Sequence, residues 1–204
     1  MPTATVDPTR TRLLAAAKTL FARQGYENTA TSAIARDAST SESQLVRYFG
    51  GKAGLLDAIF EESWAPLNAR VHDLLADAVD ARHAVGAILT AVLTAFERDE
   101  ELAIIFLFEG RRIRAGTNQV RLSAGFEEFN SVVQRLIRRG QKDGSFSEEF
   151  DADAMSAALM GAAEGMVRER LLAKRDGAQR PFSDRQVQRI FNAFLDGFTP
   201  RRRR

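Results

Sequence analysis

Apolar side chains recur at helical spacing along almost the whole chain, and this pattern limits the chain to an all-α fold. Leu13, Leu14, Ala17, Leu20 and Phe21, for example, fall on one face of a helix. No stretch alternates apolar and polar residues in the way that a half-buried strand does. The sequence therefore predicts about nine helices and no sheet.

One segment, residues 29–52, is predicted to form two short helices joined by a tight turn. The first helix begins near Thr29, which we expect to cap it, and ends at Asp37, with Ile34 facing inward. Residues 38–40 then form the turn. Because the connection is so short, the two helices should pack against each other.

The second short helix combines a polar start with apolar anchors. Ser41 is expected to cap its first turn, and Gln44 follows at the spacing of a capping box. Leu45 and Phe49 stand one turn apart and should hold the helix in the core, before Gly50 ends it. A short helix with a polar tip behind a tight turn is the outline of a helix-turn-helix motif, which reads the DNA major groove.

Charge is unevenly divided along the chain, although the total is nearly neutral. Residues 1–52 hold seven Lys or Arg and four Asp or Glu, whereas the rest holds 22 basic and 23 acidic side chains. A basic front end fits a protein that offers this end to a polyanion. We therefore expect a helix-turn-helix DNA-binding domain in residues 1–51 and a separate helical body in residues 52–204.

Local signals predict the shape of the body helices. The longest carries Pro66, which should kink or break it near residues 62–66 because proline removes a backbone donor. Residues 102–108 are apolar on all sides, so their helix should be buried all round. The last helix opens with Ser183 and Gln186, at the spacing of a second capping box.

Composition excludes several classes of protein. The chain has no Cys, so neither a disulfide framework nor a thiolate metal site is expected. The N-terminus lacks the apolar core of a signal peptide and no apolar run approaches ~18 residues, so we expect a cytoplasmic protein without a membrane span. His72 and His83 stand beside no plausible nucleophile or ligand set and should be solvated. The sequence therefore predicts no enzyme, no cofactor and no metal site.

Residues 10–60 resemble the TetR family of bacterial transcriptional regulators. The matching elements are the Ala17/Phe21 face, Gly25-Tyr26, Thr29, Ile34-Ala35, Leu45, Tyr48-Phe49 and Lys52 followed by Leu55-Leu56. The chain departs from the family pattern at Ser39, where glycine is usual, and at Val46, where an aromatic residue is usual. The first departure predicts a strained or differently shaped turn, and the second an altered site preference.

The polar side chains around the second short helix are the candidate DNA contacts. Gln44 suits adenine, Arg47 suits guanine or a phosphate, and Val46 suits a thymine methyl group. Glu42 suits cytosine or simply stabilises the helix start, and Tyr48 should contact the DNA backbone. The alternatives are a solvated Gln44, a surface ion pair of Arg47 and a Tyr48 ring that packs on the first helix. The complete candidate set is Thr31, Ser32, Glu42, Ser43, Gln44, Val46, Arg47, Tyr48 and Lys52.

The resemblance also implies an effector pocket and a dimer interface in the body. The candidate pocket residues are aromatic, Met and neighbouring polar side chains: Phe96, Phe106, Glu109, Phe126, Phe129, Asn130, Met155 and Met166. Ordinary core packing is the alternative for the apolar members. The last two helices should form the dimer interface, where small residues allow close approach, through Gly161, Gly165, Phe191 and Phe194.

Together these expectations describe a homodimeric repressor of an inverted-repeat operator, because a two-fold dimer reads a two-fold site. A small apolar or mixed-polarity effector would release it from double-stranded DNA. Two alternatives stay open: a regulator of the same fold without an effector, and a small-molecule-binding protein or enzyme that keeps the DNA-binding head as a relic.

Overall fold

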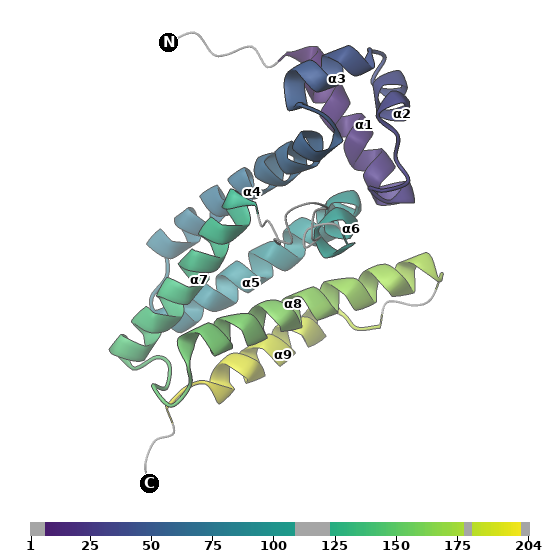
Figure 1. Ribbon diagram of the computed structural model, residues 1–204. Helices are drawn as coiled ribbons and strands as arrows, with labels where there is room; N and C mark the ends of the chain where they lie inside the picture. Colours follow the sequence, from purple (N-terminus) through teal and green to yellow (C-terminus); the bar gives the residue numbers. More distant parts are fainter. Residues whose placement is uncertain (1–6, 109–122, 178–180, 201–204) are drawn as a thin grey trace. The chain divides into compact units, whose positions relative to one another are not determined.

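The computed structural model describes residues 7–108, 123–177 and 181–200 of the 204-residue chain. All regular structure in these ranges is helical, which confirms the predicted all-α class (Figure 1). The helices are α1 (Pro8–Gln24), α2 (Thr31–Asp37), α3 (Glu42–Phe49), α4 (Lys52–Ala76), α5 (Ala81–Arg98), α6 (Glu100–Phe108), α7 (Ala124–Asp143), α8 (Ala152–Arg175) and α9 (Asp184–Gly197). None of these helices combines the length and the hydropathy that a membrane span needs.

The chain forms two compact units. The first contains residues 1–64 and 101–123, and the second contains residues 65–100 and 124–204. Helix α4 therefore contributes residues to both units. The functional boundary that we predict after residue 51 lies within the first unit and stays a prediction.

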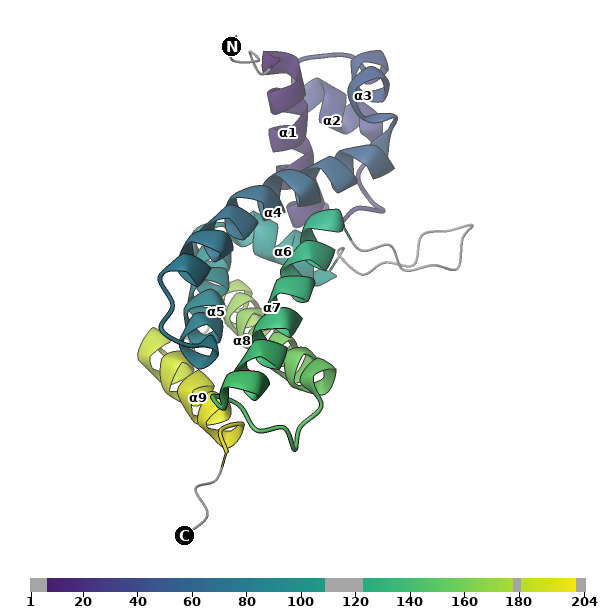
Figure 2. The ribbon, with the colours of Figure 1, turned by 90° about the vertical axis from the view of Figure 1, so that its left-hand side faces the viewer.

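In the first unit, α1, α2 and α3 pack around one apolar core (Figure 2). Leu13, Ile34 and Leu45 come from one helix each, and none of them has exposed surface. Burying a side chain of this size contributes about 1.5–3 kcal/mol. This packing is what holds α3 in shape, because a helix of eight residues is not stable alone.

The rest of the first unit is built on aromatic packing between α4 and α6. The ring of Phe106 stands edge-on to Phe60 and Trp64, with ring centroids 5.1 and 5.0 Å apart. Residues 103–105 of α6 are buried, but Leu102 is half-buried. The expectation that this helix is buried all round is therefore wrong, because Leu102, Phe106 and Leu107 are only half-buried.

In the second unit, α5 is the central helix. It packs against α7, α8 and α9, and Figure 2 shows these helices around it. The core of the unit includes Val85, Ile88, Phe129, Leu159 and Leu195, all at most 1% exposed. An amphipathic α5 at the centre explains why its apolar stripe is broad.

Three helix ends form as their local signals predict. Asp7 caps α1, since the backbone N–H of Thr9 donates to Asp7 Oδ1 at 2.8 Å. Gly25 ends α1 with a φ of +81°, a conformation that suits glycine. Ser183 and Gln186 form both bonds of a capping box at the start of α9.

Two other local predictions have a different outcome. Helix α4 runs through Pro66 without a break, and a kink there stays a prediction; Glu62, Ala65 and Pro66 are exposed, so the carbonyl that loses its partner lies on the solvent side. Thr29 does not cap α2. Its side chain is buried and its Oγ1 donates to the carbonyl of Gly25 at 2.7 Å, while Ala30 occupies the N-cap without a side-chain bond.

Candidate nucleic-acid interface

The turn between α2 and α3 is closed by backbone hydrogen bonds. The N–H of Thr40 donates to the carbonyl of Ala35 at 2.9 Å, and the N–H of Ser39 donates to the carbonyl of Arg36 at 3.1 Å. This pair of bonds is a Schellman motif, which places Ser39 in a left-handed conformation. Ser39 adopts a φ of +51°. The serine therefore keeps the turn that glycine would form, in a conformation that costs a non-glycine residue about 1–2 kcal/mol.

A side chain of α1 fastens the same turn. Arg12 Nε donates to the carbonyl of Ala38, the C-cap residue of α2, at 3.0 Å. A charged donor makes a stronger bond than a neutral one, so this contact holds the end of α2 against α1. The entry into α3 is thereby fixed from two sides.

Helix α3 turns a polar face outward. Its start is capped, since the N–H of Gln44 donates to Ser41 Oγ at 3.4 Å, and Leu45 on the opposite face has no exposed surface. The exposed side chains of the helix are Glu42, Ser43, Val46 and Arg47, and the half-buried ones include Gln44 and Tyr48. Val46 is 57% exposed, so an apolar side chain stands uncovered among polar neighbours.

Phe49 and Gly50 form the end of α3. Phe49 is half-buried, so it is a weaker anchor than predicted, and the guanidinium carbon of Arg10 lies 5.4 Å from its ring centre. Gly50 adopts a φ of +71°, and its N–H donates to the carbonyl of Val46 at 2.7 Å. The predicted end of the helix is confirmed.

Tyr48 reaches back to the start of α1. Its hydroxyl donates to the carboxylate of Asp7, across 41 residues of sequence. The hydrogen bond lowers the pKa of Asp7 and raises the pKa of Tyr48, because it favours the charged carboxylate and the neutral phenol. The hydroxyl that we predict to contact a phosphate is therefore already oriented by a carboxylate.

Lys52 is bound to the loop between α1 and α2. Its Nζ donates to the carbonyls of Tyr26 at 2.9 Å and Thr29 at 3.1 Å, and it lies 4.4 Å from the ring centre of Tyr26. These contacts tie the first residue of α4 to the loop before α2. The phosphate contact of Lys52 stays a prediction, and no sequence pattern indicated its bonds to these two carbonyls.

Two hydrogen bonds involve the remaining candidates at the start of α2 and α3. Thr31 Oγ1 donates to Glu42 Oε2 at 2.6 Å, and the hydroxyls of Ser41 and Ser43 are 2.8 Å apart. Ser32 is exposed. All nine candidate residues thus belong to α2, α3 or the first turn of α4. Exposed polar side chains at the start of a firmly held short helix suit the major groove, which is about 12 Å wide.

Comparison with known proteins agrees with this geometry. Residues 13–59 match the family described as bacterial regulatory proteins, tetR family, a range that covers most of α1, all of α2 and α3 and the first turns of α4. The HTH-type transcriptional repressor KstR2 of Rhodococcus jostii (strain RHA1) is 28% identical over 144 residues, which are 71% of each chain. Residues 13–59 therefore match the tetR family of bacterial regulatory proteins. The likeness supports a DNA-binding transcriptional regulator.

Another relative and two solved structures extend the likeness along the chain. The nucleoid occlusion factor SlmA of Aliivibrio fischeri (strain MJ11) is 26% identical over 158 residues, covering 75% of this chain and 78% of SlmA. The fatty acid degradation regulator FadR from Bacillus halodurans has a TM-score of 0.79 at 19% identity, covering 92% of this chain and 98% of FadR. The ketosteroid regulator KstR2 of Mycobacterium tuberculosis has a TM-score of 0.72 at 21% identity, covering 97% and 98%. The two structures support the tetR fold, a DNA-binding head followed by a helical domain.

The predicted pocket residues are divided between the two compact units. Phe106 belongs to the first unit, where it packs on Phe60 and Trp64. Phe129 and Met155 are core residues of the second unit with 0% and 2% exposure. Their place in an effector pocket stays a prediction, because an apolar stripe looks the same in a core and in a cavity wall.

The other pocket candidates are scattered. Asn130 Oδ1 accepts a hydrogen bond from Ser156 Oγ at 3.4 Å, and Phe126 and Met166 are half-buried. Glu109 lies outside the residues that the structure describes. Phe96 alone of the predicted set lines the cleft of the second unit that is considered below.

The candidate dimer residues differ in their exposure. Phe191 is only 3% exposed within the single chain, so it belongs to the core of α9 and has no surface to offer a second copy. The burial of Phe191 therefore argues against its predicted place in the dimer interface. Gly161 is exposed, with open space where a Cβ would stand, and Gly165 and Phe194 are half-buried. Ile190 adds 49% exposure of a large apolar side chain on α9.

Metal and acid–base chemistry find little support in the described ranges. No three His, Cys, Asp or Glu side chains converge there as metal ligands. His72 and His83 are both exposed, as predicted. His72 Nε2 lies 3.3 Å from Glu128 Oε1, which is a surface contact.

Proposed function

We propose that this chain is a repressor of the tetR family that binds an inverted-repeat operator as a homodimer and releases it when a small molecule binds. The observation that carries the proposal is the outward polar face of α3, held by Leu45 from within and by the Schellman turn from behind. Residues 1–51 are assigned to DNA binding and residues 52–204 to effector binding and dimerisation.

Base recognition is assigned to three side chains of α3, the half-buried Gln44 and the exposed Val46 and Arg47. Gln44 has the donor and acceptor that adenine requires, and the exposed Arg47 has the fork that guanine or a phosphate requires. Val46, exposed and apolar, suits a thymine methyl group. An aliphatic residue at this position, where the family usually has an aromatic one, gives the chain its own site preference.

Backbone contacts are assigned to residues that flank α3. The Tyr48 hydroxyl would move from the Asp7 carboxylate to a phosphate oxygen, while Ser32 and Ser43 donate hydroxyl bonds. Thr31 orients Glu42, whose carboxylate discourages a phosphate at that point and accepts from cytosine.

Dimerisation is assigned to the exposed surface of α8 and α9. Gly161, with no neighbour near the position of a Cβ, lets another helix approach closely, and Ile190 supplies apolar area beside Phe194. Identical helices from two copies form a two-fold interface, so the paired heads read two inverted half-sites.

Effector release is supported by what related proteins bind. The KstR2 relative is named a transcriptional repressor, and the regulator FadR from Bacillus subtilis, with a TM-score of 0.77 at 17% identity, was crystallised with stearoyl-CoA. Differential affinity of an effector for the DNA-free state shifts the population away from the operator. Helix α4 contributes to both compact units and is the element that we assign to transmission.

Selection of bound duplexes from a random pool tests the proposal. We expect an inverted repeat, with half-sites one helical turn or a multiple of it apart, and affinity that falls steeply with salt. A selected site without two-fold symmetry would contradict the homodimeric mode, and affinity independent of salt would contradict the phosphate contacts.

A regulator of the same fold without an effector is the second candidate. It is favoured by the close packing of Phe129 and Met155 where we had expected a cavity. Screening small molecules for release of the selected duplex separates the two candidates, because only the first has a molecule that releases DNA without unfolding the protein.

A further inference from the structure

A cleft of about 590 Å³ opens in the second unit between α5 and α8. Its apolar lining consists of Leu93, Phe96, Val167 and Leu171, and its polar lining includes Glu97, Glu100, Arg170 and Lys174. The volume falls within the range of about 300–1,000 Å³ that drug-sized ligands occupy. Most of the pocket residues predicted from the sequence lie elsewhere.

The charges of the cleft are already balanced. Arg170 forms an ion pair with Glu97, and Lys174 forms one with Glu100. A charged ligand that displaces Glu97 from Arg170, whose side chain is 11% exposed, would leave a buried charge without compensation, which is costly. The Lys174 side chain is 70% exposed, so its pair with Glu100 is screened by solvent and adds less. An uncharged ligand keeps both pairs, and the apolar side chains supply the favourable area.

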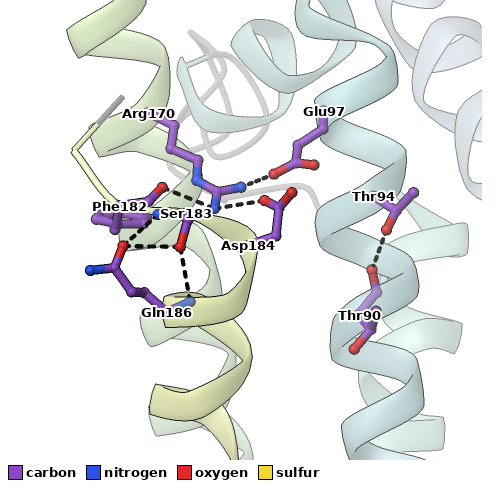
Figure 3. A network of polar contacts seen from close by, with 8 residues as sticks. All are labelled: Thr90, Thr94, Glu97, Arg170, Phe182, Ser183, Asp184 and Gln186. Atoms are coloured by element: carbon purple, nitrogen blue, oxygen red, sulfur yellow. Dashed lines mark hydrogen bonds and ion pairs between the residues drawn. The ribbon is translucent and has the colours of Figure 1, made fainter. Parts of the chain in front are cut away.

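Arg170 makes one wall of the cleft rigid. Its side chain is only 11% exposed, and its Nη2 lies 2.9 Å from Asp184 Oδ1 and donates to the carbonyl of Phe182 at 3.3 Å (Figure 3). Its guanidinium carbon also lies 5.1 Å from the ring centre of Phe182. The wall is thus built by α5, α8 and the start of α9 together, before any ligand arrives.

We propose that this cleft binds an uncharged, predominantly apolar small molecule, which rests on Phe96, Val167 and Leu171 below the two ion pairs. Arg170 positions the wall and joins the cleft to the first turn of α9 through Asp184. The inference rests on the proposed function in taking the occupant as the effector. The test of the cleft uses no DNA, so the assigned ligand can be refuted without refuting the proposed repressor function, and the reverse.

Two fluorescent probes that differ by one charge provide the first test. N-phenyl-1-naphthylamine is uncharged, and 8-anilinonaphthalene-1-sulfonate is the same skeleton with a sulfonate. Titrated against the full chain, the uncharged probe should bind at least ~10-fold more tightly, since only the sulfonate disturbs the ion pairs. Equal or tighter binding of the sulfonate would overturn the assigned ligand class.

Filling the cleft provides the second test. Val167→Phe should weaken binding of the uncharged probe at least ~10-fold, because it occupies the apolar floor. Val79→Phe is the matched control, since Val79 is 88% exposed and outside the cleft. An equal affinity in both variants would place the probe elsewhere and overturn the site.

A cysteine label keeps the test valid if Val167→Phe does not fold. The chain has no Cys, so Lys174→Cys creates a single thiol at the cleft and Val79→Cys a single thiol away from it. The uncharged probe should slow reaction of a thiol reagent at position 174 and leave position 79 unchanged. No protection at position 174, or a thiol there that is unreactive without any probe because a second copy covers it, would overturn the proposal. Loss of DNA binding alone would leave it standing.

Discussion

At the scale of single residues, Ser39 stands out because it is the one described non-glycine residue with a positive φ. It holds the left-handed position of the turn without being glycine. Ser39→Gly should therefore raise the free energy of unfolding by about 0.5–1 kcal/mol, after the added chain entropy of glycine is subtracted. Urea unfolding measures this. Ser43→Gly, inside α3, is the control and should lower the free energy of unfolding by a similar amount. A lower free energy of unfolding in both variants would contradict backbone strain at Ser39.

The contact between Tyr48 and Asp7 makes a prediction about pH. The Asp7 pKa is lowered from 3.8, so its stabilising contribution is present above that value and is lost as pH falls through the folded pKa. The Tyr48 pKa is raised from 10.0, so its contribution is present below that value and is lost as pH rises through the folded pKa.

Tyr48→Phe should remove both effects at once. Because the bond needs a charged carboxylate and a neutral phenol, the stability difference between the wild type and this variant should be constant near neutral pH. It should shrink below pH 3.8 and at strongly alkaline pH. Chemical unfolding across pH measures the difference, and a difference that grows on acidification would contradict the contact.

At the scale of elements, the clamp at the start of α4 separates a structural role from a DNA contact. Lys52→Met removes the donor to the Tyr26 and Thr29 carbonyls and should lower the free energy of unfolding by about 1–2 kcal/mol. If the same ammonium also contacts a phosphate, the slope of log affinity against log salt falls by about 0.9. Unchanged stability would show that the clamp contributes nothing.

Helix ends that depend on neighbouring residues were predictable from the sequence. Asp7 before Pro8, Gly25 and the Ser183–Gln186 pair all act within one turn, so their signals are local. The Pro66 break and the Thr29 cap failed because exposure and burial decided them, and neither is visible locally. The break did not form because a solvent-facing carbonyl tolerates the missing donor.

Contacts between distant residues could not be predicted in the same way. The nine DNA-contact candidates gather on α2, α3 and the first turn of α4, because one motif carries them all. Tyr48 and Asp7 are 41 positions apart, and Lys52 and Tyr26 are 26 apart, so no spacing rule connects them. Phe129 and Met155 are buried by packing that only the three-dimensional arrangement fixes, so the sequence alone could not separate a core stripe from a pocket wall.

At the scale of the whole molecule, the proposed two-fold pairing predicts a specific loss. Gly161→Trp should convert the dimer into a monomer, because a large ring then stands where a second helix must approach. The fold should survive, since Gly161 is exposed and no atom lies within 4 Å of the position of a Cβ there. Sedimentation at micromolar concentration measures the mass, with Val79→Trp as control. A dimer that persists in Gly161→Trp would move the interface away from α8.

The central claim is that the outward face of α3 reads base sequence. Its most direct test is the ratio of dissociation constants for a scrambled and a selected duplex, measured at one salt concentration for the wild type and for Gln44→Ala. We predict that the ratio falls about 5- to 150-fold in the variant, the equivalent of one lost bidentate base contact, while affinity for the scrambled duplex is unchanged. An unchanged ratio would contradict the claim.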